Sequence, residues 1–162
     1  MLRARALSTS FALFVTAVAF AQAPSFDVQV EGHPSMTFSA DDVAKLAQHT
    51  VQVKEHDKTI TYTGVLVCDV LAQAGAPSGD KLRGKALSSY VLATAKDGYA
   101  VVYALPEFDP QFTDAKPLIA TKADGQPLSE TQGPYRIVLP QDKKPARSLR
   151  MLQRIEVVQL RK

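Results

Sequence analysis

Cysteine is almost absent from this chain, since Cys68 is the only one among 162 residues. A single thiol cannot form an internal disulfide, so the fold has to rest on a buried apolar core, for which the chain is long enough. We expect Cys68 to pack half-buried in a short helix, because free cysteine is among the most frequently buried residue types. A reactive thiol is the alternative interpretation.

Histidine is also scarce, with His33, His49 and His56 as the only three. None of them forms a His-x-x-x-His or Glu-x-x-His pair, so the sequence predicts no metal site. The chain also lacks a phosphate-cradling glycine loop and a Gly-x-Ser-x-Gly motif, so neither kind of enzyme is indicated by its motif.

The N-terminal residues have the three-part layout of a secretory signal peptide. Arg3 and Arg5 form a basic start, an apolar run over residues 11–20 follows, and Ala19-Phe20-Ala21 is a small-x-small cleavage pattern. The run is short for a membrane span, which needs roughly 20 apolar residues. An uncleaved N-terminal anchor is the alternative.

We therefore predict two segments, a signal peptide over residues 1–21 and a single domain over residues 22–162. The mature chain would be periplasmic or secreted, with no membrane span after cleavage. Its length fits one domain.

The charge of the mature chain is close to balanced. The full sequence has 19 Lys and Arg against 16 Asp and Glu, and removing Arg3 and Arg5 leaves 17 against 16. Global charge therefore gives no reason to expect a nucleic-acid partner. A local excess of positive charge remains near the C-terminus, since residues 142–162 hold seven basic and two acidic residues.

Short strand patterns outnumber helical patterns along the chain. Strands are expected at residues 26–30, 51–53, 59–63, 90–95, 99–104, 117–121, 135–139 and 155–160. One helix should follow Ser39, a good N-cap residue, and include Val43, Leu46 and Ala47. A second should bury Val67, Val70, Leu71 and Ala74. The sequence predicts an α+β fold with a mixed, β-rich sheet or partial barrel and short helices.

A basic group near the C-terminus is the most notable chemical feature. Arg136 follows Gly133-Pro134, and Arg147, Ser148 and Arg150 follow a charged loop. Two guanidinium groups and a hydroxyl that converge near a strand end could bind a phosphate. From spacing alone, a solvated basic edge on a terminal strand is the simpler interpretation.

Eight short segments in order give this chain a family resemblance. They are YTGVLVCDVL at residues 62–71, AG at 74–75, KDGY at 96–99, LP at 105–106, PLIA at 117–120, DGQPL at 124–128, GPYRIVLP at 133–140 and SLRMLQRIEV at 148–157. With them the chain resembles the molybdopterin-binding domain of sulfite-oxidase-type oxidoreductases, as a reduced, stand-alone version. The resemblance covers residues 26–158 and implies that family's fold.

The resemblance also implies cofactor-binding residues. The arginine after the Gly-Pro pair and the Ser-x-Arg run help to hold the pterin phosphate in that family, which implies Arg136, Ser148 and Arg150 here. Thr131 is near a position that often makes a polar cofactor contact. The family's enzymes ligate molybdenum through a cysteine upstream of the Tyr-Thr-Gly-Val segment, and residues 49–60 contain none.

We therefore expect a binding module that has kept the fold and lost the metal ligand. Its partner would be a small anionic ligand or a periplasmic protein, with no metal, no cofactor and no nucleic acid. The alternative is a molybdopterin-dependent oxidoreductase or a subunit of one, with molybdopterin as its cofactor. A pocket filled by the chain's own side chains is a third interpretation.

Overall fold

The computed structural model of this protein describes residues 23–55 and 57–161. The predicted signal peptide lies outside these residues, so the cleavage site and the division into segments stay predictions. None of the helices within the described residues is long and apolar enough to cross a membrane.

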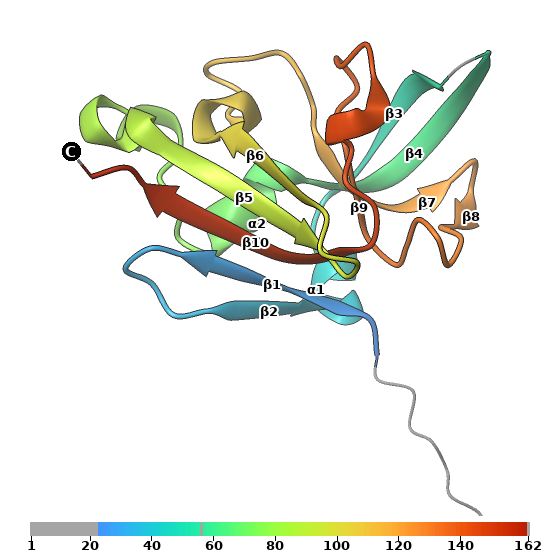
Figure 1. Cartoon of the computed structure of the whole chain (residues 1–162), viewed down its shortest axis with the longest axis horizontal. Helices are drawn as coiled ribbons and strands as arrows, with labels where there is room; N and C mark the ends of the chain where they lie inside the picture. Colours follow the sequence, from blue (N-terminus) through green and yellow to red (C-terminus); the bar gives the residue numbers. More distant parts are fainter. Residues whose placement is uncertain (1–22, 56, 162) are drawn as a thin grey trace, which may run out of the picture.

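The described residues form two open, five-stranded sheets (Figure 1). Sheet A has the order β2-β1-β10-β5-β6, with strands Ser25–Val30 (β1), Met36–Ser39 (β2), Ser89–Ala95 (β5), Ala100–Ala104 (β6) and Leu152–Gln159 (β10). Sheet B has the order β3-β4-β7-β8, with β9 also paired to β7; its strands are Gln48–Glu55 (β3), Lys58–Leu66 (β4), Leu118–Ala123 (β7), Gln126–Pro127 (β8) and Arg136–Val138 (β9). Sheet A is mixed because β1 and β10 are parallel and its other pairs are antiparallel. The predicted α+β class is confirmed.

Helices are few and short among the described residues. The α-helices are Ala40–Lys45 (α1) and Val67–Gln73 (α2), and the 3₁₀ turns are Gly79–Lys81 (η1), Gly84–Ser88 (η2), Leu105–Phe108 (η3) and Pro145–Arg147 (η4). Ser39 caps α1 as predicted, since its hydroxyl accepts from the Asp42 backbone N–H and the Asp42 carboxylate accepts from the Ser39 backbone N–H.

The first helix is shorter than the sequence suggests. It ends at Lys45, and Ala47 is exposed rather than on a buried helical face. The Gln48 side chain donates to the carbonyls of Val43 and Leu46, and β3 begins at the same residue. Strand pairing with β4 therefore takes over where the helical pattern would have continued.

Two apolar clusters lie on opposite faces of sheet B. The larger joins the buried face of sheet A and α2 to residues such as Ile119 and Ile137. The smaller contains Tyr62, Ala120 and Val138 with Val53. Since successive side chains of a strand point to opposite faces, neighbours on β7 and β9 fall into different clusters. Arg136 is two residues before Val138 and so lies on the face of the smaller cluster.

Gly64 permits a close approach between two strands of sheet B. A Cβ at this position would lie 2.1 Å from the carbonyl oxygen of Ile119 and 2.6 Å from the Cα of Ala120. The pairing of β4 with β7 shifts register between Thr63 and Gly64. Glycine is therefore required here for β4 and β7 to pair this closely.

Candidate functional site

An open cavity of about 670 Å³ lies where sheet B meets the turn between β5 and β6. Its wall includes the end of β3, that turn and the segment between residues 132 and 150. The lining residues are Glu55, Asp97, Tyr99, Gln132, Arg136, Lys144, Pro145, Ala146, Ser148 and Arg150. The volume is within the range of small-molecule sites.

Three of the four predicted ligand-binding residues line this one cavity. Arg136, Ser148 and Arg150 contribute to its wall. Thr131 does not; it is exposed, and its hydroxyl lies 3.2 Å from that of Ser129. The basic group is thus gathered around a cavity rather than spread along a strand edge.

Arg136 is buried and held by residues from three other parts of the chain. Only 3% of it is exposed. Its Nη2 donates to Glu55 Oε1 at 2.7 Å, and its Nη1 donates to the Tyr62 hydroxyl and to Gln132 Oε1, the latter at 2.9 Å. The guanidinium carbon also lies 5.0 Å from the centre of the Tyr62 ring. A buried guanidinium requires such partners because an unpaired buried charge is strongly destabilising.

One nitrogen of the Arg136 guanidinium, the buried Nε, has no hydrogen-bond partner among the described residues. Glu55 uses only one carboxylate oxygen on the guanidinium. A buried Nε without an acceptor is unusual, since buried polar groups are nearly always hydrogen-bonded.

Tyr62 links Arg136 and Glu55 through hydrogen bonds of its hydroxyl. Its hydroxyl donates to Glu55 Oε1 at 3.0 Å while accepting from Arg136. Burial raises the pKa of Tyr62 to about 12, with the charge of Arg136 opposing and that of Glu55 adding to the shift. The phenol therefore stays protonated at neutral pH and cannot itself serve as a base.

Ser148 has a structural contact in the cavity wall. Its hydroxyl oxygen accepts from the backbone N–H of Leu139 at 3.1 Å, and the side chain is buried. The 3₁₀ turn η4 sets its position, because the Ser148 N–H donates to the Pro145 carbonyl at 2.9 Å. The hydroxyl proton is not used in any of these contacts.

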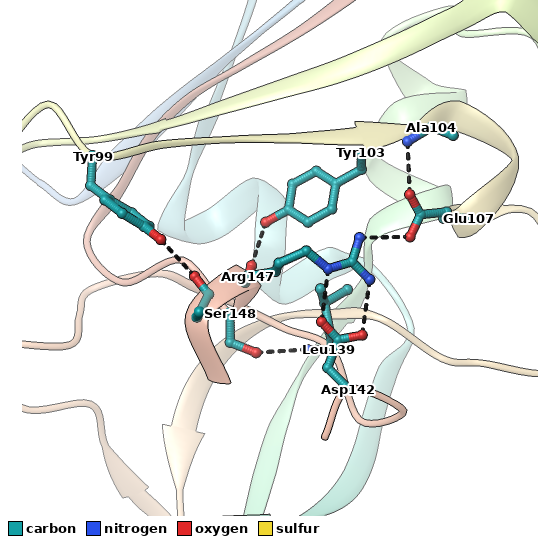
Figure 2. A network of polar contacts seen from close by, with 9 residues as sticks. Tyr99, Tyr103, Ala104, Glu107, Leu139, Asp142, Arg147 and Ser148 are labelled. Carbon is teal, nitrogen blue, oxygen red and sulfur yellow. Dashed lines mark hydrogen bonds and ion pairs between the residues drawn. The ribbon is translucent and has the colours of Figure 1, made fainter. Parts of the chain in front are cut away.

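Arg147 fastens the same wall to sheet A, as Figure 2 shows. Its Nε and Nη2 both donate to Asp142 at 2.9 Å, and its Nη1 donates to Glu107 of η3 at 2.9 Å. The hydroxyls of Tyr103 and Tyr99 donate to the carbonyls of Arg147 and Ala146. Hydrogen bonds to these two carboxylates raise the pKa of Arg147, so the side chain stays charged. That charge is already paired with Asp142 and Glu107 of the same protein.

Lys144 and Arg150 are the cations of the cavity without such partners. Both are exposed, and neither forms an ion pair with any of the described residues. Lys144, Glu55, Tyr62 and Gln132 were not among the predicted site residues. Lys144 belongs to the charged loop, and Gln132 is only four residues before Arg136. Glu55 and Tyr62 are brought to Arg136 by the fold alone.

The matching family model is the oxidoreductase molybdopterin-binding domain, over residues 51–162. The chain belongs to this family. A search of curated proteins finds no match. Among solved structures the fold is similar to the sulfane dehydrogenase SoxCD from Paracoccus pantotrophus, with a TM-score of 0.62 and 14% sequence identity. That alignment covers 82% of this chain and 37% of the SoxCD chain, so it supports the fold alone.

The family's cofactor fits this site only in part. The basic cavity offers guanidinium and ammonium groups suited to a phosphate. Molybdenum needs a strong ligand such as a thiolate. Cys68 lies on α2 and lines other, smaller hollows, one with Leu82 and Phe108 and one with Pro110 and Lys116. Its thiol donates to Asp69, and burial raises its pKa to about 11.

Other metal ligands are not grouped either. Within residues 23–55 and 57–161, no three His, Cys, Asp or Glu side chains gather in a way that could hold a metal ion. The described residues therefore do not fit the metal of this cofactor, whereas the phosphate-binding character of the cavity remains.

Proposed function

We propose that this protein is an exported binding module that holds a small ligand with a phosphate-like oxyanion group. One observation carries the proposal: Arg136, Ser148 and Arg150, predicted as a phosphate grip, line a single open cavity. The export part rests on the Arg3 and Arg5 start, the apolar run and the Ala19-Phe20-Ala21 pattern.

The charges of the cavity favour an anion. Glu55 already neutralises Arg136 through their ion pair. Lys144 and Arg150 remain, and Asp97 is the other acidic residue of the lining. The two cations are exposed, so they should attract an oxyanion most strongly at low ionic strength. Their contribution to affinity should fall when salt is added.

The test is a titration of the purified chain with inorganic phosphate at low ionic strength, followed by calorimetry or amide chemical shifts. The wild type should bind with one site per chain. A Lys144→Ala/Arg150→Ala double variant should bind about tenfold more weakly, which corresponds to about 1.4 kcal/mol.

A matched control keeps the net charge the same. Lys122→Ala/Arg154→Ala removes two exposed cations that do not line the cavity. It should leave the phosphate affinity within about twofold of the wild type, given how weakly exposed charges act across screened distances. Equal losses in both double variants would contradict a localised site.

Family membership favours a second candidate function, a molybdopterin-dependent oxidoreductase or a subunit of one. The chain spans 37% of the SoxCD chain, so an activity of that whole protein is not carried over. Elemental analysis after expression in a native host supplied with molybdate separates the two. We expect less than stoichiometric molybdenum; about one atom per chain that is lost in Cys68→Ser would establish the oxidoreductase instead.

A further inference from the structure

We propose that the segment of residues 79–88, called here the turn segment, binds an anionic membrane surface. It contains the 3₁₀ turns η1 and η2 and joins α2 to β5. Three exposed cations lie on it, Lys81, Arg83 and Lys85, and Asp80 is its only acidic residue. The inference goes beyond the proposed function and does not depend on the ligand of the cavity.

The charges of the turn segment are available to a partner. None of its three cations forms an ion pair with any of the described residues. Lys81 and Lys85 are four residues apart, so their Cα atoms are separated by at most about 14 Å. Leu82 is buried and Ala86 packs half-buried against the core, which holds the segment in place and leaves its cations exposed. The three cations can therefore meet one surface together.

Two exposed leucines accompany the cations. Leu87 of the turn segment is 43% exposed, and Leu160 after β10 is 62% exposed. The end of β10 is tied to the turn segment, since the Leu160 N–H donates to the Ser88 carbonyl at 3.2 Å and the Ser88 hydroxyl donates to the Leu160 carbonyl at 3.3 Å. At an anionic bilayer, apolar side chains enter the acyl boundary while cations meet the lipid phosphates. The combination favours a lipid surface over an acidic soluble protein, for which the cations alone would suffice.

The turn segment is separate from the ligand cavity. Figure 1 shows it at the left-hand edge of the molecule, beside the end of β10. It leads directly into β5, which ends at Ala95, two residues before Asp97 of the cavity wall. A strand of seven residues spans roughly 20 Å. A lipid surface at the turn segment would therefore leave the cavity open to its ligand.

Co-sedimentation of the purified protein with lipid vesicles tests the inference. One set of vesicles contains phosphatidylglycerol and phosphatidylcholine in equal parts, and the other contains phosphatidylcholine alone. We expect binding to the anionic vesicles only, weakened by added salt, because each cation near an anionic surface contributes about fivefold in affinity. Absence of binding to the anionic vesicles at low ionic strength would overturn the proposal.

A triple variant locates the binding surface. Lys81→Gln/Arg83→Gln/Lys85→Gln should bind the anionic vesicles at least about tenfold more weakly than the wild type. The matched control removes three exposed cations of sheet B instead, in the variant Lys54→Gln/Lys58→Gln/Lys122→Gln. It should stay within about twofold of the wild type, because its cations lie outside the contact. Equal losses in both triple variants would show that net charge governs binding, which contradicts a site at the turn segment.

A leucine double variant separates a lipid surface from a soluble acidic partner. Leu87→Ser/Leu160→Ser keeps every cation, so it should bind poly-glutamate like the wild type but the anionic vesicles at least about fivefold more weakly. Val102→Ser/Phe112→Ser, which removes two other side chains that are 58% and 50% exposed, should change neither. Thermal unfolding confirms that each variant is folded. If the leucine variant binds vesicles as tightly as the wild type, the turn segment is a site for soluble polyanions and the membrane proposal is wrong.

Discussion

Arg136, Arg147 and Arg150 lie close together in the sequence and have three different environments. Arg136 is buried against Glu55 and Tyr62, whereas Arg147 is committed to two carboxylates in the cavity wall. Arg150 is exposed on the cavity. Among these guanidinium groups, only that of Arg150 is available to a ligand without first breaking an ion pair.

The thiol of Cys68 should react slowly at neutral pH. Burial is the main cause that raises the pKa of its thiol to about 11, and the neighbouring Asp69 adds to the shift. The thiolate is the reactive form, so at neutral pH labelling should be about 100-fold slower than for an ordinary exposed thiol. The rate should climb as the pH approaches 11, because the raised pKa delays formation of the thiolate.

Labelling with a thiol reagent at pH 7, 9 and 10, with urea-unfolded protein as the control, measures this. Rapid stoichiometric labelling of the native protein at pH 7 would contradict the half-buried packing role.

The sequence could predict three of the residues that gather at the cavity but not how each is used. Spacing and resemblance pointed to Arg136, Ser148 and Arg150, and all three line one wall. Glu55 is 81 residues before Arg136, and their contact depends on the register of β3 with β4 and of β7 with β9. Such long-range pairing has no local sequence signal.

At the scale of elements, the segment between Leu139 and Ser148 forms a wall held mainly by polar contacts. Arg147 joins it to η3, and Tyr103 of β6 donates to its backbone. The Ser148 hydroxyl closes it onto Leu139. This wall carries Lys144, so its stability and the position of a cavity cation are linked.

Arg147→Ala should therefore loosen the wall. Its side chain is 40% exposed, so the ion pairs are partly screened, and we expect a loss of about 1–2 kcal/mol in the free energy of unfolding. Phosphate binding should weaken as well. Arg154→Ala, which removes a similarly exposed ion pair with Glu156 on β10, should cost less than about 0.5 kcal/mol.

Chemical denaturation of both variants provides the comparison. Equal stabilities for Arg147→Ala and the wild type would contradict a fastening role for this network.

Element boundaries were predictable where local pattern and tertiary pairing agree. The alternation Phe26, Val28 and Val30 predicted β1, and these residues are buried. By contrast, β2 has only four residues, with a weak pattern of its own, and exists through its pairing with β1. Tyr99 falls within the strand expected at residues 99–104, but it precedes β6 and is 51% exposed at the cavity.

For the whole molecule, export is the property most open to a direct test. The basic start and the Ala19-Phe20-Ala21 pattern predict cleavage after Ala21. The intact mass of protein recovered from the periplasmic fraction should correspond to residues 22–162. Replacing Ala19 and Ala21 by Arg, which blocks a small-x-small site, should leave an uncleaved precursor, whereas Gln22→Asn should be processed normally. A native mass that retains Met1 would contradict the prediction.

The central position of β10 in sheet A has a consequence for the order of folding. Its partners are β1 on one side and β5 on the other, with Asp27 paired to Arg154 and Val91 to Val157. The two hairpins of that sheet, β1–β2 and β5–β6, can each form from neighbouring residues. They cannot join into one sheet until the last tenth of the chain arrives between them. Assembly of sheet A should thus be slow, governed by closure of the long loop between β1 and β10, and in a chain that is still emerging from the ribosome or a translocation pore this sheet should not join until β10 is free.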